Sequence, residues 1–185
     1  MPTSYYGQIS TVMNFVQEIN PKSILDVGIG FGKYGVLCRE NLDIPYERYP
    51  KDTWQVRIDG IEGYKGYKNP IHTYVYNKVY YGTIEKTIKK LDTLYDLALM
   101  IDVLEHFEKK AGDEIISQIQ SKCRKLLVSV PAIPSQQTYL DNHLETHKSI
   151  WKINDFIKHY LLEACSVPMG PNNASIIVLL QGRKD

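Results

Sequence analysis

The chain has 185 residues, a formal net charge of +1, 43% hydrophobic residues and 23% charged residues, an ordinary composition for a globular protein. At this length we expect one domain over residues 1–185, with a core that needs no disulfide or metal staple. A net charge near zero lacks the excess of Lys and Arg that a nucleic-acid groove or an anionic membrane surface requires, so we predict neither partner.

The cysteines Cys38, Cys123 and Cys165 are widely spaced. An odd number without a CxxC pair argues against a disulfide framework or a zinc site, so we expect reduced thiols in a cytoplasmic protein. The first residues are polar and rich in Tyr, unlike a signal peptide, and no apolar run approaches the roughly 20 residues of a membrane span.

Strand-like and helical patterns alternate along the chain. A helical pattern over 4–19 precedes a strand over 23–27, a helix over 32–40, a solvated loop over 41–53 and strands over 55–62 and 78–81. A helix over 84–91, a strand over 95–101, a helix over 109–122 and a strand over 125–130 follow. After a polar segment over 131–149 come a helix over 154–160, which Asn154 would cap, and strands over 161–167 and 175–181.

This alternation predicts an α/β fold, with helices on both faces of a mostly parallel sheet. The last two strands are joined by residues 168–173, a spacing that predicts a closing hairpin and hence one antiparallel strand at the end of the sheet. We interpret the Tyr- and Lys-rich run over 64–81 as surface and core packing rather than a platform for stacked bases. Ligands of such sheets bind beyond the carboxyl ends of the strands.

A glycine-rich turn follows the first predicted strand. Residues 30–35 (GFGKYG) match the GxGxxG dinucleotide fingerprint, whereas residues 26–32 (DVGIGFG) match an acidic-x-GxGxG pattern. In a dinucleotide site the first glycine closes the turn directly after the strand, and Gly28 already holds that place behind Asp26. The Asp26 carboxylate would repel a pyrophosphate and would suit a cation such as the ammonium of a methionine moiety. We favour the second pattern; a nicotinamide site and a glycine turn without a ligand remain the alternatives.

Two segments together resemble a known family. The run ILDVGIGFG over 24–32 resembles motif I of class I S-adenosylmethionine-dependent methyltransferases, and DLALMIDVLEHF over 96–107 resembles motif IV in its DVLEH form, common in small-molecule enzymes. The resemblance covers nearly the whole chain. It implies a Rossmann-like three-layer sandwich, a mostly parallel seven-stranded sheet with an antiparallel closing strand, and S-adenosylmethionine as the cofactor.

The same resemblance implies positions for the parts of the cofactor. Glu62 resembles the acidic residue that takes both ribose hydroxyls. Thr83 stands where the family often has an Asp that contacts adenine, so its hydroxyl or a backbone carbonyl would replace that contact. Asp102 is expected near the methionine end or the acceptor, and residues 5–7 in the N-terminal segment (1–20) near the cofactor. The full predicted cofactor-binding set is Asp26, Gly28, Gly30, Gly32, Glu62, Gly63, Thr83, Ile84, Asp102, Val103 and His106.

The polar segment 131–149 follows the fifth strand and should overhang the acceptor. The run NHLETHKSIW over 142–151 places His143 and His147 there, and we expect these histidines and Asp102 to be the catalytic residues, with a histidine as base if the acceptor must lose a proton. Ordinary surface histidines on a polar loop are the alternative. His106 is either a base or a structural residue. We predict no metal site, because two histidines four residues apart have no evident third ligand.

These observations predict an S-adenosylmethionine-dependent methyltransferase that acts on an oxygen, nitrogen or carbon atom of a small metabolite or sugar-like acceptor. Methyl transfer is an in-line displacement for which positioning of the acceptor can supply much of the catalysis, so the absence of a catalytic triad does not argue against it. Two alternatives remain: a non-catalytic module that keeps the cofactor site, and an NAD(P)-dependent oxidoreductase of the Rossmann type.

Overall fold

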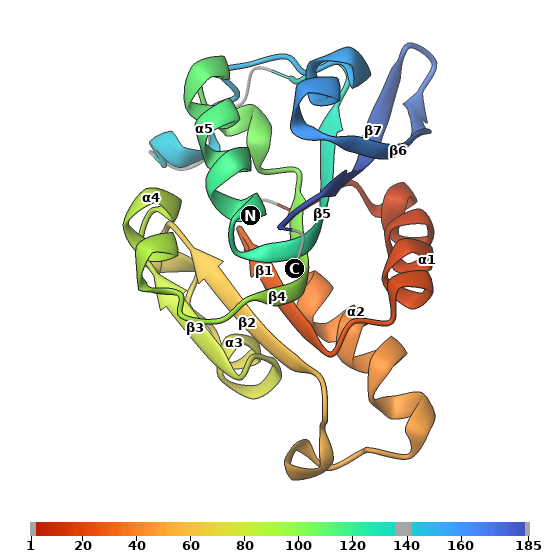
Figure 1. The fold of residues 1–185 in the computed structure, drawn as a ribbon, viewed down its shortest axis with the longest axis vertical. Coiled ribbons are helices and arrows are strands. Elements are labelled where there is room, and N and C mark those ends of the chain that lie inside the picture. Colours follow the sequence, from red (N-terminus) through yellow and green to blue (C-terminus); the bar gives the residue numbers. More distant parts are fainter. Residues whose placement is uncertain (1–2, 136–141, 184–185) are drawn as a thin grey trace.

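The computed structural model describes residues 3–135 and 142–183, and its centre is one seven-stranded sheet with the strand order β3-β2-β1-β4-β5-β7-β6 (Figure 1). The strands are β1 (Ser23–Val27), β2 (Arg57–Glu62), β3 (Lys78–Tyr81), β4 (Tyr95–Ile101), β5 (Cys123–Pro131), β6 (Leu161–Gly170) and β7 (Asn173–Gln181). The predicted α/β class and the number of strands are confirmed.

The first five strands are parallel to one another, and the sheet is closed by an antiparallel hairpin. β1 pairs in parallel with β2 and β4, and β4 with β5, whereas β7 runs antiparallel to both β5 and β6. The antiparallel strand therefore lies inside the sheet, and β6 forms the edge. β7 is buried over most of its length, which agrees with its apolar sequence, while β6 alternates between exposed and half-buried residues.

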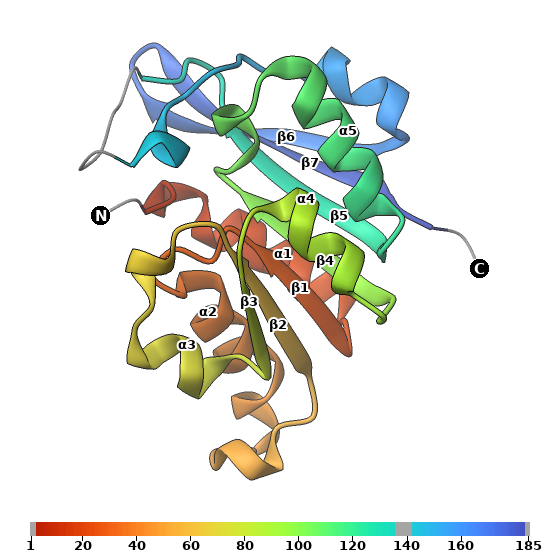
Figure 2. The same ribbon diagram turned by 90° about the vertical axis from the view of Figure 1, so that its left-hand side faces the viewer.

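Helices cover both faces of the sheet (Figure 2). On one face α1 (Ile9–Ile19), α2 (Lys33–Leu42) and α3 (Pro70–Val75) pack on a core that includes Val16, Cys38 and Leu99. On the other face α4 (Ile84–Thr87) and α5 (Lys109–Gln120) pack on a core that includes Met100 and Trp151. Two apolar cores on one sheet make the three-layer arrangement that the alternating pattern predicted.

The predicted helices are present, but their ends differ from the predicted ones. The N-terminal helical pattern begins with a 3-10 turn, Tyr6–Gln8, before α1, and the pattern over 84–91 is a short α-helix continued by a 3-10 turn, Ile88–Lys90. The predicted helix over 154–160 is a 3-10 helix, Ile153–His159, whose N-cap residue is Lys152 rather than Asn154. No helix in the described parts of the chain is both long and apolar enough to cross a membrane.

Two segments differ from expectation. Helix α3 lies within residues 64–77, for which the sequence predicted no helix or strand. The loop over 41–53, expected to be solvated, is mostly exposed but has a buried anchor, because the fully buried Asp43 accepts from Arg39 at 2.9 Å and from the Gln55 backbone N–H at 2.8 Å. This ion pair fixes where the loop leaves helix α2 and where it enters β2.

Candidate functional site

A cavity of about 800 Å³ opens at the carboxyl ends of the parallel strands. Its wall is built from the turns that follow β1, β2, β3 and β4, from the N-terminal segment and from the segment after β5. The predicted residues in this wall are Asp26, Gly28, Gly30, Glu62, Gly63, Thr83, Ile84, Asp102, Val103, His106 and His147. Gly32 and His143 are not among its lining residues.

The turn after β1 has a backbone that favours glycine. Gly28, Gly30 and Gly32 have φ angles of 76°, 52° and 102°, in the left-handed region. A Cβ on Gly28 would also lie 2.5 Å from a methyl carbon of Val103, so the turn after β4 packs directly on this glycine. Gly32 is the N-cap residue of α2, which explains why it shapes the turn without lining the cavity. The glycines thus bring the backbone close to the cavity.

Asp26, the last polar residue of β1, is 3% exposed and lines the cavity. The Tyr76 hydroxyl donates to its Oδ2 at 2.6 Å. Burial raises the pKa of Asp26 to about 7, the Tyr76 hydrogen bond opposes the rise, and the charge of Glu62 adds to it. The carboxylate therefore has one fixed protein donor, and a cationic ligand in the cavity would favour its ionised form.

Glu62, at the end of β2, ties its own turn to the glycine turn. Its Oε2 accepts from the Gly30 backbone N–H at 2.9 Å, and its Oε1 accepts from the Tyr64 N–H at 2.8 Å. Burial raises the pKa of Glu62, and these N–H groups oppose the rise. Each carboxylate oxygen keeps a lone pair for a further donor, which is what a bidentate contact with two hydroxyls requires.

His72 on α3 supports the glycine turn, and sequence reasoning missed it. Its Nε2 lies 2.8 Å from the Gly30 carbonyl oxygen, and its Nδ1 lies 3.0 Å from the Tyr81 hydroxyl. Burial lowers its pKa. Asn69 caps α3 by accepting from the Ile71 N–H at 2.8 Å, and Pro70 follows it, so the Asn-Pro pair was the signal that could have revealed this helix.

The turn after β3 presents Thr83 and the buried Ile84 to the cavity. The Thr83 carbonyl already accepts two hydrogen bonds from Thr87, one from the backbone N–H at 3.0 Å and one from the side-chain hydroxyl at 2.5 Å. The Thr83 hydroxyl is therefore the freer group for an adenine contact. Leu144, which also lines the cavity, approaches Gly63, since a Cβ on that glycine would lie 3.1 Å from a Leu144 methyl carbon.

Asp102, directly after β4, holds the N-terminal segment at the cavity. It has a left-handed φ of 53°, and its Oδ2 accepts from the Tyr5 backbone N–H at 2.9 Å and from the Gln8 side chain at 2.7 Å. Its Oδ1 accepts from the Ser129 hydroxyl at 2.8 Å. Lys33 adds a second tie by donating to the Ser4 carbonyl at 2.7 Å. These bonds bring residues 3–6 into the cavity wall and give Asp102 a positioning role. Of the expected residues 5–7, Tyr5 and Tyr6 line the cavity and Gly7 does not.

The segment after β5 is anchored to the turn after β4. The backbone N–H groups of Lys148 and Ser149 donate to the Glu105 carbonyl at 2.7 and 3.2 Å. This brings the ring of His147 to 4.8 Å from the ring of His106. Residues 136–141 of the predicted acceptor-side loop lie outside the described residues.

The structure separates the two histidines that the sequence analysis paired. His143 starts a 3-10 turn, His143–Glu145, is exposed and is not among the residues that line the cavity, although it was expected beside the acceptor. The chain is extended after that turn, and the helical pairing of His143 with His147 does not form. Of the two, His147 alone faces the cavity.

Glu105 is a buried and His106 a half-buried polar residue of the 3-10 turn after β4. Glu105 is 2% exposed, and burial together with the charge of Asp102 raises its pKa well above the ordinary value. Burial and the neighbouring charge of His147 lower the pKa of His106 to about 4. Among the described residues, Glu105 Oε2 and His106 Nδ1 have no hydrogen-bond partner. This wall of the cavity therefore keeps unsatisfied polar atoms.

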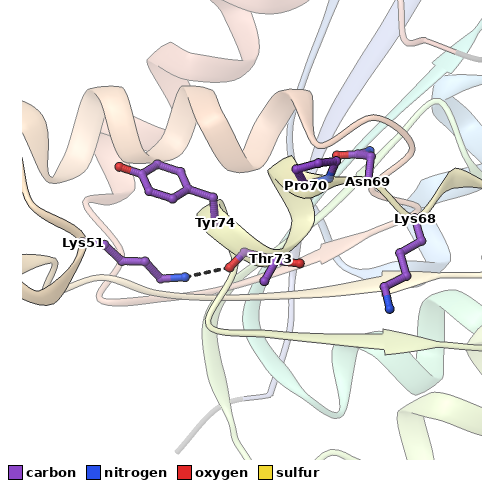
Figure 3. Close-up of a pocket in the computed structure, with 6 residues that line it drawn as sticks. All are labelled: Lys51, Lys68, Asn69, Pro70, Thr73 and Tyr74. Atoms are coloured by element: carbon purple, nitrogen blue, oxygen red, sulfur yellow. Dashed lines mark hydrogen bonds between the residues drawn. The ribbon is translucent and has the colours of Figure 1, made fainter.

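A second hollow lies elsewhere, beside α3, and is lined by Lys51, Lys68, Asn69, Pro70, Thr73 and Tyr74 (Figure 3). Lys51 closes one side by donating to the Thr73 carbonyl at 2.7 Å. None of the predicted site residues lines it, and we assign it no role.

The strand order and the antiparallel β7 define the fold of the class I S-adenosylmethionine-dependent methyltransferases. No family model matches the chain, and no curated protein matches it.

Solved structures of this class superimpose on most of the chain at low identity. The methyltransferase domain of bacterial CtHen1-C has a TM-score of 0.62 and 14% identity, with 96% of this chain and 98% of that one covered. Magnesium protoporphyrin IX methyltransferase from Synechocystis PCC 6803 with bound S-adenosylmethionine has a TM-score of 0.58 and 17% identity, and the match covers 95% of this chain and 80% of that one. The third structure is the 1,6-didemethyltoxoflavin-N1-methyltransferase of Burkholderia thailandensis with bound 1,6-didemethyltoxoflavin and S-adenosylhomocysteine. It has a TM-score of 0.59 and 13% identity, and the match covers 100% of this chain and 93% of that one.

Proposed function

We propose that the chain is an S-adenosylmethionine-dependent methyltransferase acting on a small-molecule acceptor. The observation that carries this proposal is the convergence of the glycine turn, Asp26 and Glu62 on one cavity at the carboxyl ends of the strands. In the proposed complex the Asp26 carboxylate pairs with the ammonium of the methionine moiety, Glu62 accepts from the ribose hydroxyls, and Thr83 and Ile84 contact adenine.

A cavity of about 800 Å³ is in the range of small-molecule sites, and it would have to hold both cofactor and acceptor. The room left beside the cofactor suits a small acceptor. One structure with the same fold was determined in the presence of S-adenosylhomocysteine and D-fucose, and another has bound 1,6-didemethyltoxoflavin and S-adenosylhomocysteine, which supports an acceptor of this size. The free cysteines fit a reducing compartment, and we propose the cytoplasm.

The test is thermal unfolding with S-adenosylmethionine, S-adenosylhomocysteine and reduced nicotinamide cofactors in parallel. A ligand at about 100-fold over its Kd should stabilise the fold by about 2.7 kcal/mol, which is a shift of roughly 5–11 °C at this chain length. We expect this shift with the two adenosyl ligands. A shift with the nicotinamide cofactors alone would instead identify an oxidoreductase.

Turnover separates an enzyme from a binding module. The release of S-adenosylhomocysteine is measured over a panel of hydroxyl, amine and carbon acceptors, with the Asp26→Asn variant as the matched control. Cofactor binding without product from any acceptor would contradict the proposed activity and favour a non-catalytic module.

A further inference from the structure

We propose that Glu105, His106 and His147 bind a divalent transition-metal ion in the acceptor-side wall of the cavity. One potential ligand atom from each residue lies within 4.8 Å of the others, and all three residues line the cavity. Ligands that share an ion at about 2.0–2.2 Å lie closer together than this, so small rotations of the side chains would close the cluster on a metal.

The unsatisfied atoms of this cluster point to a ligand. Glu105 Oε2 and His106 Nδ1 are its atoms without a described partner, and a buried polar atom left unpaired destabilises the folded state. The Glu105 side chain is almost fully buried, yet no Lys or Arg pairs with it in the described residues. A bound cation would satisfy both atoms at once.

His147 is oriented for the same role. Its Nδ1 contacts the Ser135 carbonyl oxygen, and since a carbonyl only accepts, Nδ1 carries the proton. Nε2 of the ring is then left with a lone pair. A metal-bound histidine is commonly held in this way, with its second nitrogen donating to a backbone carbonyl.

The donor set selects the kind of ion. Two imidazole nitrogens and one carboxylate oxygen favour Zn²⁺, Co²⁺, Fe²⁺ or Mn²⁺ over Mg²⁺ and Ca²⁺, which prefer oxygen ligands alone. Three protein ligands leave coordination positions open, and because the residues line the cavity those positions would face it.

The open positions suggest the class of acceptor, and this step rests on the proposed function. A hydroxyl oxygen bound to the ion has a lowered pKa and releases its proton to solvent water. The oxygen lone pair then forms the new C–O bond to the methyl carbon while the C–S bond breaks and its electron pair stays on sulfur. The acceptor class that the cluster favours is therefore an alcohol or phenol, methylated on oxygen.

Metal binding can be measured without turnover. The full chain, stripped of metal with a chelator, is titrated with Co²⁺ alone, followed by calorimetry and by the visible absorption of the bound ion, and the titration is repeated with Zn²⁺. We expect one ion per chain, and at least a tenfold loss of affinity in His147→Ala and in Glu105→Gln. The matched control is His143→Ala, which removes an exposed histidine of the same segment and should leave the affinity unchanged.

Several outcomes would overturn the site: no stoichiometric binding, equal affinity in wild type and His147→Ala, or loss of binding in His143→Ala. Circular dichroism of each variant checks that it folds, and His147→Ala alone decides the matter if Glu105→Gln does not fold. S-adenosylmethionine binding is measured on the same samples. Cofactor binding without metal binding would refute the metal site but not the proposed function. Metal binding without cofactor binding would refute the proposed function but not the metal site.

Discussion

Replacing Asp26 by Asn should stabilise the protein while weakening its hold on the cofactor. The folded state raises the pKa of this carboxyl from the usual 3.8 to about 7, chiefly through burial. Each pKa unit corresponds to about 1.4 kcal/mol, so the ionised carboxylate destabilises the folded state by about 4 kcal/mol above pH 7. The Asn side chain has nearly the same shape and can still accept from the Tyr76 hydroxyl, which donates to Asp26 at 2.6 Å.

The sign of the pH dependence follows from proton binding. Below pH 4 the Asp26 carboxyl is protonated in both the folded and the unfolded state and contributes nothing. Between pH 4 and 7 the unfolded chain loses this proton and the folded chain keeps it, so stability falls as the pH rises. Above pH 7 both states are ionised and the loss is complete. Between pH 5 and pH 8 the variant should therefore gain about 3 kcal/mol relative to the wild type.

Urea unfolding of the two proteins at pH 5 and pH 8, without cofactor, measures this difference. Asp52→Asn, at an exposed position, is the matched control and should show no pH-dependent difference from the wild type. Calorimetry at pH 8 should show the opposite effect on function, with a Kd for S-adenosylmethionine raised about 10- to 100-fold, as expected for loss of a charge-assisted contact. A pH-independent stability difference, or a less stable variant at pH 8, would refute the reasoning.

Three further changes test other contacts of the cavity. Gly28→Ala adds a Cβ that would lie 2.5 Å from a Val103 methyl at a φ of 76°, and should lower the free energy of unfolding by about 1–3 kcal/mol in urea titrations; an unchanged midpoint would contradict the close approach. His72→Ala removes the contact with the carbonyl of the glycine turn and should raise the Kd for S-adenosylmethionine about tenfold, whereas an unchanged Kd would make this histidine merely structural. Asp102→Ala removes the acceptor of the Tyr5 N–H, and hydrogen exchange at that amide should speed up at least tenfold while amides in the central strands keep their protection.

The fold was predictable because its signals are local and repeated. The apolar run of β4 and the alternation of β2 each mark a strand wherever the rest of the chain lies. Helix α3 has only six residues, too few for a helical period to stand out, so its Asn69 cap was the sole clear sign. The place of β7 between β5 and β6 depends on long-range pairing, which hydrophobic periodicity does not report.

The candidate site was predictable only where its residues adjoin a motif. Asp26 and Glu62 sit at strand ends beside recognisable turns, and both line the cavity. Tyr76 and His72 reach the same turn from α3 and its C-terminal end, through contacts that no spacing encodes. His147 was expected near the acceptor for its place after the fifth strand, but its partner is His106 rather than His143, because the backbone pairing with the turn after β4 decides the register.

The acidic side chains in the cavity wall differ in how far the protein satisfies them. Asp26, Glu62 and Asp102, on the proposed cofactor side, each accept hydrogen bonds of 2.6–2.9 Å from the protein. Such groups are oriented before any ligand arrives, which lowers the ordering cost of binding. On the acceptor side the buried atoms of Glu105 and His106 have no described partner. Folding alone gives no reason to bury them, so a ligand at this wall accounts for their retention better than packing does.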